Sequence, residues 1–285
     1  MPRVIATISL KGGVGKTTLT AGVAEFLSAV LGKRVLVIDL DAQTSLTSIM
    51  IGPDRWLELN DRGRTLATLF SDALDGTSYF DRDQVLQCRV SPVAEVTGVD
   101  LLPASLDFIE LQEELSAHRV LADDHAAAVD ILRRGVAPIL GNYDYVLIDC
   151  PPNMGPFSLN GLAMSDGFVI PTIPDVLSTY AIPHVQRYVA DFASEIGRPI
   201  RELGLIISKF RASSALHQDT VTRLRRDPTI QNVLPAYVHE GNAIGAAAAY
   251  SPASTLRARY GHHGHYEQLE ALTRAIVTEA QAKLP

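Results

Sequence analysis

Residues 9–18 have the sequence SLKGGVGKTT, which combines closely spaced glycines with two lysines and two threonines. Glycines allow a loop to turn its backbone N–H groups inward onto an anion, and the N-terminus of a following helix adds partial positive charge. Lys16 can reach the β- and γ-phosphates of a nucleotide, and the Thr17 hydroxyl can ligate the accompanying magnesium ion. The segment therefore predicts a phosphate-binding loop.

Strand and helix patterns flank this loop. Residues 4–8 form a short β-branched run of strand type, and apolar residues from Leu19 to Leu31 recur at helical spacing. The loop is therefore expected at a strand-to-helix corner, where backbone N–H groups can converge on phosphate. The alternative is a glycine-rich turn in which the lysine has no function.

Two further apolar runs, residues 34–41 and 143–149, end in aspartates. Continuous apolar runs are typical of central strands in a parallel sheet, where ligands bind at the carboxyl ends of the strands. Asp39 and Asp41 are therefore expected to face the nucleotide, unless they cap the next helix. Asp149 ends its strand as a carboxylate that holds magnesium does, usually through a water molecule, opposite the threonine of the loop.

These motifs resemble those of the ParA/MinD family of ATPases. The family's deviant P-loop has the pattern Lys-Gly-Gly-x-x-Lys-Thr/Ser, whereas the general P-loop has a glycine at the position of Leu10. Residues 39–43 resemble the family's Asp-x-Asp-Pro-Gln motif with Ala42 in the proline position, and residues 149–152 resemble its Asp-x-Pro-Pro switch. The residues that match the deviant P-loop are Lys11, Gly12, Gly13, Lys16 and Thr17.

The resemblance implies a role for each of these side chains. Lys11 of one subunit would reach across to the phosphates held by a second subunit, and Asp41 would orient the attacking water. With Lys16 assisting, the implied catalytic residues are Lys11, Lys16 and Asp41. The implied magnesium and water network contains Thr17, Asp39 and Asp149.

The resemblance extends to two strand ends in the second half of the chain. Ser208 and Lys209 stand where family members often have Asn followed by Lys or Arg, in a loop against the adenine ring. Residues 233–237 are similar to the family's Ile-Pro-Arg-Asn strand end, and Tyr237 is expected either to flank the base or to pack within the protein. The implied nucleotide-binding residues are Lys11, Gly12, Gly13, Val14, Gly15, Lys16, Thr17, Thr18, Ser208, Lys209, Pro235 and Tyr237.

The order of these elements predicts an α/β fold. The resemblance implies a doubly wound, mostly parallel sheet with helices on both faces, as in P-loop NTPases of the deviant Walker A type. We expect residues 1–285 to form a single ATPase domain, with a partly helical elaboration at about 52–100. Residues 106–140 and 266–283 are predicted to be helical, because apolar residues recur there at helical spacing.

Composition excludes several classes of protein. The chain has 285 residues, 47% of them hydrophobic, which is ample for a buried core. Its apolar runs fall short of the roughly 18 residues that a membrane span needs, so we expect a cytoplasmic protein without membrane contact. Cys88 and Cys150 lie far apart without metal-ligand spacing, and residues 261–265 place three histidines in a glycine-flanked stretch that we predict to be a surface loop.

Basic residues concentrate in one part of an otherwise acidic chain. The net charge is −7, yet residues 187–226 contain eight basic and four acidic side chains. Arg223 and Arg226 share a face if their segment is helical, which suits contact with DNA phosphates. The alternative is a solvated helix end with cations near its C-terminus. The candidate DNA-binding residues are Lys209, Arg211, Arg223, Arg225 and Arg226.

The resemblance implies an ATP-dependent switch. ATP and Mg²⁺ would create a homodimer that binds double-stranded DNA nonspecifically at the nucleoid, and a ParB-like partner would stimulate slow ATP hydrolysis. Such a cycle would segregate or position a plasmid, a chromosome or another cargo. One alternative is a MinD-like ATPase that cycles on membranes, although the basic C-terminal helix expected of such a protein is missing. A second is an ATP-dependent scaffold for a protein cargo. A third is a reductase like the nitrogenase iron protein, but Cys88 and Cys150 do not match the cysteines that bridge its cluster.

Overall fold

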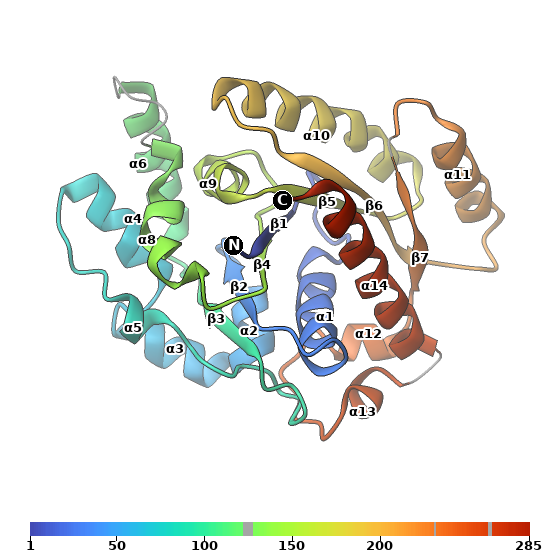
Figure 1. Cartoon of the computed structure of the whole chain (residues 1–285), viewed down its shortest axis with the longest axis horizontal. Coiled ribbons are helices and arrows are strands. Elements are labelled where there is room, and N and C mark those ends of the chain that lie inside the picture. Colours follow the sequence, from blue (N-terminus) through green and yellow to red (C-terminus); the bar gives the residue numbers. More distant parts are fainter. Residues whose placement is uncertain (122–127, 231, 262–263) are drawn as a thin grey trace.

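A seven-stranded parallel sheet forms the centre of the molecule (Figure 1). The computed structural model describes residues 1–121, 128–230, 232–261 and 264–285. The strand order is β3-β2-β4-β1-β5-β6-β7, and each neighbouring pair is parallel. The strands are β1 (Arg3–Thr7), β2 (Val35–Asp39), β3 (Val99–Leu102), β4 (Tyr145–Asp149), β5 (Gly167–Thr172), β6 (Arg201–Phe210) and β7 (Val233–His239).

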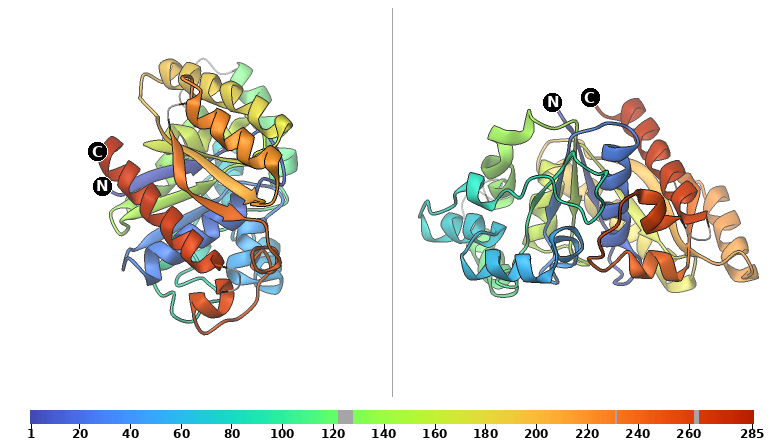
Figure 2. Two further views of the ribbon diagram at one scale, coloured as in Figure 1. Left: turned by 90° about the vertical axis from the view of Figure 1, so that its right-hand side faces the viewer. Right: turned by 90° about the horizontal axis from the view of Figure 1, so that it is seen from below.

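Helices cover both faces of this sheet (Figure 2). One core contains side chains of α1, α2, α13 and α14, and the other contains side chains of α4, α6, α8, α9, α10 and α11. This arrangement confirms the predicted doubly wound fold. The helices are α1 (Lys16–Ala29), α2 (Ser45–Ile51), α3 (Pro53–Asp61), α4 (Leu66–Asp75), α5 (Arg82–Val85), α6 (Phe108–Leu121), α8 (Ile131–Leu140), α9 (Pro156–Met164), α10 (Val176–Glu195), α11 (Ala215–Arg226), α12 (Asn242–Ala246), α13 (Leu256–Tyr260) and α14 (His265–Lys283).

The register of the central strands brings the predicted acidic strand ends together. Asp39 of β2 lies opposite Asp149 of β4, and Asp149 lies opposite Thr7 of β1. All five residues of β2 and of β4 are buried, as expected for strands covered on both faces. The loop after β1 and the ends of β2 and β4 therefore meet at one edge of the sheet.

The region at about 52–100 is partly helical, with α3, α4 and α5. It packs onto the rest of the chain, because Phe70 of α4 lies edge-on against Phe108 and Phe157. Trp56 of α3 donates a hydrogen bond from Nε1 to the Ala104 carbonyl at 3.1 Å. Since this region shares a core with the sheet, we propose that it is an elaboration of a single domain.

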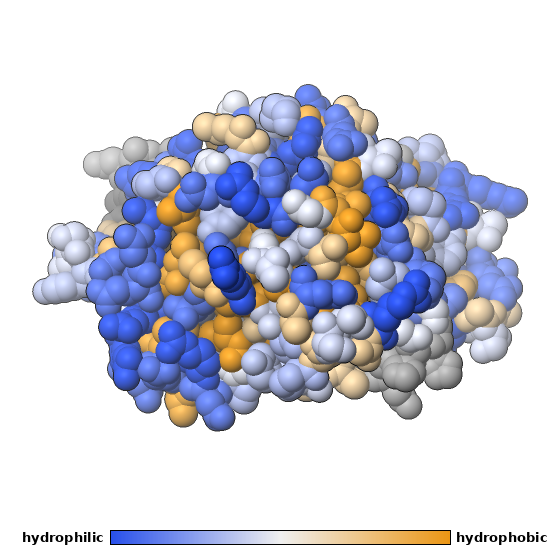
Figure 3. Space-filling model, turned by 60° about the horizontal axis from the view of Figure 1, so that its bottom comes forward, coloured by the Kyte–Doolittle hydropathy of each residue, from blue (hydrophilic) through white to orange (hydrophobic). Residues whose placement is uncertain are grey.

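The segment predicted to be helical at 106–140 contains α6 and α8, and its residues 122–127 lie outside the described ranges. Helix α14 agrees with the helix predicted at 266–283. Of the histidines predicted to lie in a surface loop at 261–265, His262 and His263 lie outside the described ranges. The prediction is wrong for His265, which is buried at the start of α14. None of the described helices combines the length and apolar character of a membrane span. On the face shown in Figure 3, hydrophobic patches are broken up by hydrophilic side chains.

Candidate nucleotide-binding site

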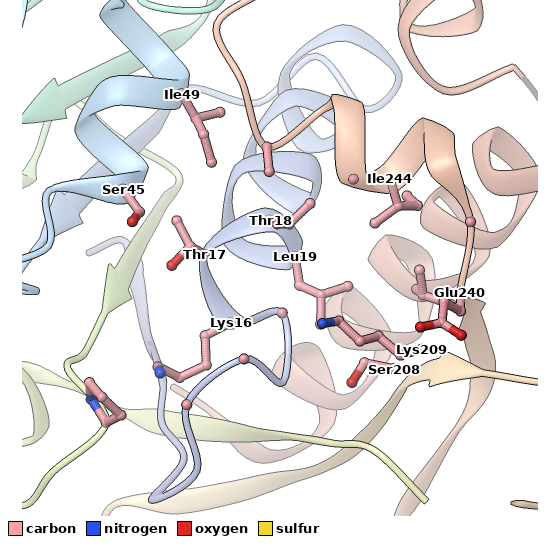
Figure 4. Close-up of a pocket in the computed structure, with 18 of the residues that line it drawn as sticks. Lys16, Thr17, Thr18, Leu19, Ser45, Ile49, Ser208, Lys209, Glu240 and Ile244 are labelled. Carbon is pink, nitrogen blue, oxygen red and sulfur yellow. The ribbon is translucent and has the colours of Figure 1, made fainter. Parts of the chain in front are cut away.

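A cavity of about 810 Å³ lies at the carboxyl edge of the sheet (Figure 4). At one end are Lys16, Thr17 and Ser45, and at the other are Lys209, Glu240 and Ile244. The full lining is Gly12, Gly13, Gly15, Lys16, Thr17, Thr18, Leu19, Asp41, Gln43, Ser45, Ile49, Pro152, Ser208, Lys209, Val238, His239, Glu240, Gly241, Ile244, Gly245 and Ala248.

The glycine-rich loop forms the first end of the cavity. Gly13 and Gly15 have φ values of 75° and 86°, in the left-handed region that side chains with a Cβ atom rarely adopt. Gly15 immediately precedes α1, so the loop delivers the backbone into the first turn of a 14-residue helix. Lys16 is 6% exposed at this helix start. The arrangement can bind phosphate through backbone N–H groups, the helix dipole and one cation.

Thr17 and Asp149 form the polar pair behind this loop. The Thr17 hydroxyl donates to Asp149 Oδ2 at 2.7 Å, and Asp149 Oδ1 is buried without a hydrogen-bond partner among the described residues. Burial and the neighbouring Asp39 raise the pKa of Asp149 to about 8, although Lys16 and Thr17 act in the opposite direction. A magnesium ion held by one carboxylate, a threonine hydroxyl and substrate phosphates fits this donor set.

The two aspartates after β2 have different environments. Asp39 Oδ2 accepts hydrogen bonds from the backbone N–H and hydroxyl of Thr47 at 2.8 and 2.7 Å, and Oδ1 accepts from Asp41 N–H at 3.1 Å. Burial raises the pKa of Asp39 to about 7. Asp39 is outside the cavity lining and is engaged with α2, as in the helix-capping alternative. Asp41 lines the cavity and accepts a hydrogen bond from Gln43 N–H at 3.0 Å.

Lys11 is outside the lining of the cavity in its own chain. Its Nζ lies 2.9 and 3.2 Å from the two carboxylate oxygens of Asp175 and donates to Ser178 Oγ at 2.8 Å. Asp175 also caps α10, because its Oδ1 accepts the Ser178 N–H at 2.6 Å. Pairing with Lys11 and these hydrogen bonds hold the pKa of Asp175 below its ordinary value, against the effect of burial. The motifs in the sequence did not indicate Asp175 or Ser178.

The second end of the cavity contains some of the residues predicted to contact the base. Ser208 and Lys209 line it, whereas Pro235 and Tyr237 are outside the lining found in the described residues. Val14, predicted as part of the phosphate-binding loop, is also outside this lining. Tyr237 packs against Phe210, with ring centroids 5.0 Å apart, which agrees with the alternative of a packed tyrosine. Instead of Tyr237, the residues that follow it at the end of β7 and residues of α12 line the cavity. Sequence reasoning missed these residues because they carry no recognisable motif.

The Ser208 hydroxyl forms a hydrogen bond with the phosphate-binding loop and not with the cavity space where a base would bind. The buried hydroxyl donates to the Val14 carbonyl at 2.7 Å and so ties β6 to the phosphate-binding loop. We expect Ser208→Ala to lower the free energy of unfolding by about 1 kcal/mol, because a buried acceptor loses its partner. Urea denaturation measures this change, and Ser213→Ala, at an exposed position after the same strand, is the control. Equal stability of Ser208→Ala and wild type would contradict the assignment.

The five candidate DNA-binding residues belong to two parts of the chain, the end of β6 and the last turn of α11. Lys209 lines the cavity, and Arg211 forms an ion pair with Glu240 beside it. The other three lie in the last turn of α11, where Arg225 stands over the Tyr237 ring and Arg223 donates to Thr220 Oγ1 at 3.1 Å. Of the five, Arg223, Arg225 and Arg226 share one helix turn.

The fold and the site together define a class of protein. A glycine-rich loop between β1 and α1 is followed by a buried lysine and by a threonine that is bonded to the aspartate at the end of β4. In open parallel sheets, ligands bind at this carboxyl edge. This is the architecture of a P-loop nucleoside triphosphatase.

Comparison with known proteins specifies the family. A family model described as an AAA domain matches residues 2–201. The chain is 29% identical over 284 residues to the chromosome-partitioning ATPase Soj of Thermus thermophilus, and the match covers 98% of each chain. An uncharacterised protein of Mycobacterium tuberculosis is 28% identical over 222 residues, covering 78% of this chain but 63% of that relative. The chain belongs to the ParA/MinD family of P-loop ATPases.

Solved structures support the same fold. The structure of cobyrinic acid a,c-diamide synthase from Mycobacterium smegmatis, with a bound ATP analogue and magnesium, has a TM-score of 0.75 to this chain. The alignment covers 100% of this chain and 98% of that protein at 22% sequence identity. At this level of identity the likeness concerns the fold.

Proposed function

We propose that this protein is a magnesium-dependent ATPase that dimerises when it binds ATP. The observation that carries the proposal is the polar group of Lys16, Thr17 and Asp149 at one end of a nucleotide-sized cavity. The ATP analogue and magnesium in a protein of the same fold, and the ATPase activity in the name of the Soj relative, support the choice of ligand. Magnesium, when bound, would neutralise phosphate charge and orient the γ-phosphate.

The residues of the site suggest how hydrolysis proceeds. Asp41 orients the water that attacks the γ-phosphate, and Lys16 stabilises charge on the phosphate oxygens. Lys11 is held on its own chain by Asp175, so it has to leave this contact before it can reach phosphates in a second subunit. In the second subunit it acts as an added cation on the transition state.

The contact between Lys11 and Asp175 leads to a prediction. Asp175→Asn retains a residue that caps helices well but removes the charge that holds Lys11. We expect ATP turnover at limiting protein concentration to rise by no more than about fivefold, because a partly exposed ion pair contributes about 1 kcal/mol or less. Steady-state turnover measured over a range of protein concentrations tests this. A lower turnover would show that Asp175 assists Lys11 rather than restrains it.

We further propose that the ATP-bound dimer binds DNA without sequence preference and that a ParB-like partner stimulates hydrolysis. The basic end of α11 and the partitioning role named for the Soj relative support this proposal. A cycle of ATP-dependent binding and release then positions a plasmid, a chromosome or another cargo. This activity places the protein on the nucleoid.

Binding to a nonspecific DNA duplex, with ATP, ADP or no nucleotide at two salt concentrations, tests the proposal. We expect affinity to require ATP and to fall with salt, because contacts to phosphate release counterions. Arg223→Ala combined with Arg226→Ala should lower affinity about tenfold or more and reduce the salt slope by about four, because a variant dimer lacks two arginines in each subunit.

A double variant with the same charge change serves as the control. Arg187 and Arg274 lie on α10 and α14, each paired with an acidic residue one helical turn away, so their replacement by alanine should leave DNA affinity unchanged. If ATP produces a dimer that ignores DNA at both salt concentrations, a protein scaffold or a membrane becomes the better partner, and the DNA proposal fails.

A further inference from the structure

A buried acidic side chain joins α1 to the C-terminal part of the chain. Glu25 lies in the second half of α1, and none of its side chain is exposed. Its carboxylate accepts hydrogen bonds from the Tyr260 hydroxyl at 2.7 Å and from Ser91 Oγ at 2.8 Å. Arg259 Nε lies 3.7 Å from Glu25 Oε2, and 3% of the Arg259 side chain is exposed. Such a buried pair is stable only when its remaining hydrogen-bonding groups have partners.

Arg259 finds those partners on the backbone beyond α12. Nη2 donates to the Ala247 carbonyl at 2.7 Å, and Nη1 donates to the Ser251 carbonyl at 3.2 Å. Nε also donates to the Tyr260 hydroxyl at 3.2 Å. One guanidinium therefore holds two points of the segment that follows α12, with the fixed geometry that a lysine cannot reproduce.

The segment held in this way forms part of the cavity wall. Ala248 of this segment lines the cavity together with Ile244 and Gly245 of α12, and Ile244 lies at the end that is remote from Lys16 (Figure 4). Ala247 is buried in the core and Ile244 is partly buried against it, whereas the other residues between 245 and 250 are exposed, so few apolar contacts hold this wall. The bonds that Arg259 makes therefore contribute to its position.

The other end of the network belongs to the helix that carries the phosphate-binding loop. Lys16 and Glu25 are both in α1, about 14 Å apart along the helix axis. Glu25, Arg259 and the carbonyl of Ala247 thus link the helix of the phosphate end to the wall of the other end. If the triphosphate occupies the loop, that other end receives the base and ribose.

We propose that Arg259 is a positioning residue for the nucleotide, which it does not touch. Anchored by Glu25, it holds the base-side wall at a fixed place relative to the phosphate-binding loop. The inference rests on the proposed ATP site and adds a determinant of affinity outside the lining. A wall that is already in place avoids the cost of ordering it during binding.

Comparing the affinities of two ligands distinguishes this positioning role from a general loss of structure. Calorimetric titration with Mg²⁺ would compare ATP with inorganic tripolyphosphate, which has the phosphates but no base or ribose. In Arg259→Lys, which keeps the positive charge beside Glu25, we expect affinity for ATP to fall about tenfold. Affinity for tripolyphosphate should stay within about twofold of wild type, because the phosphate-binding loop is retained. Arg257→Lys on the same helix, where Arg257 pairs with Glu267 on the surface, is the matched control.

Equal losses for both ligands would overturn the inference, as would ATP affinity that does not change. If the wild-type chain binds neither ligand, the nucleotide site itself is refuted. Tyr260→Phe removes one hydroxyl from the network and provides a milder variant in case Arg259→Lys does not fold. In either variant without nucleotide, we expect hydrogen exchange to accelerate at the amides of residues 245–249 and to stay unchanged in the loop at 12–18. Unchanged exchange at 245–249 would contradict the role of the network.

Discussion

Asp41→Ala is expected to lower the rate of ATP hydrolysis by about 100- to 1,000-fold while ATP still binds. Asp41 lines the cavity on the side of the phosphate-binding loop, whereas Asp39 uses both carboxylate oxygens within the protein. Asp41 is therefore the carboxylate after β2 that is available to orient water. Its removal should slow the chemical step without removing the loop that holds the phosphates.

Phosphate release measured in single-turnover and steady-state assays, together with calorimetric ATP affinity, checks this prediction. Asp54→Ala, at an exposed position in the nearby helix α3, controls for the loss of one negative charge. An ATP-dependent scaffold with negligible turnover would lose nothing by the Asp41 change. Turnover that equals that of wild type would therefore exclude Asp41 as a catalytic residue.

Lys11→Gln is expected to reduce turnover by about 1,000-fold, which is typical of a cation supplied by a second subunit to a phosphoryl-transfer transition state. In the isolated chain, Lys11 forms an ion pair with Asp175 and does not line the cavity. Its replacement should therefore change the ATP affinity of the monomer little. We expect the same variant to dimerise weakly with ATP, as judged by light scattering.

Lys33→Gln is the control for this variant, because Lys33 precedes β2 at the opposite edge of the sheet. Normal turnover in Lys11→Gln would place Lys11 outside the catalytic machinery. Tight ATP binding that is lost together with turnover would instead show that Lys11 acts on phosphates within its own chain.

The features that the sequence predicted are those with a local cause. The loop at 9–18 needs glycines at Gly13 and Gly15, because the backbone there is left-handed, and this need is visible in the residue types. The buried runs of β2 and β4 are likewise continuous in sequence, and parallel strands bring their ends together. The sequence could therefore predict that Thr17, after the loop, and Asp149, at the end of β4, lie close together.

Other features depend on tertiary contacts that no local pattern encodes. Asp39 and Asp41 both end the same apolar run, and their environments differ because Thr47 of α2 turns its N–H and hydroxyl towards Asp39. The partner of Lys11 is 164 residues away, and its identity depends on where α10 begins. The second end of the cavity is lined by the strand end after Tyr237 and by α12, and Arg259 holds the backbone beyond α12; these features carry no recognisable motif.

The central claim is that two subunits share each catalytic site, with Lys11 from one and Asp41 from the other. The most direct test is ATP turnover of an equal mixture of Lys11→Gln and Asp41→Ala chains. At a protein concentration that saturates dimerisation of both variants, about half of the randomly formed dimers contain both variants, and each mixed dimer has one complete site. We predict a recovery to about one quarter of the wild-type rate per subunit. A mixture no more active than its separate components would contradict a shared site and place Lys11 and Asp41 in the same subunit's chemistry.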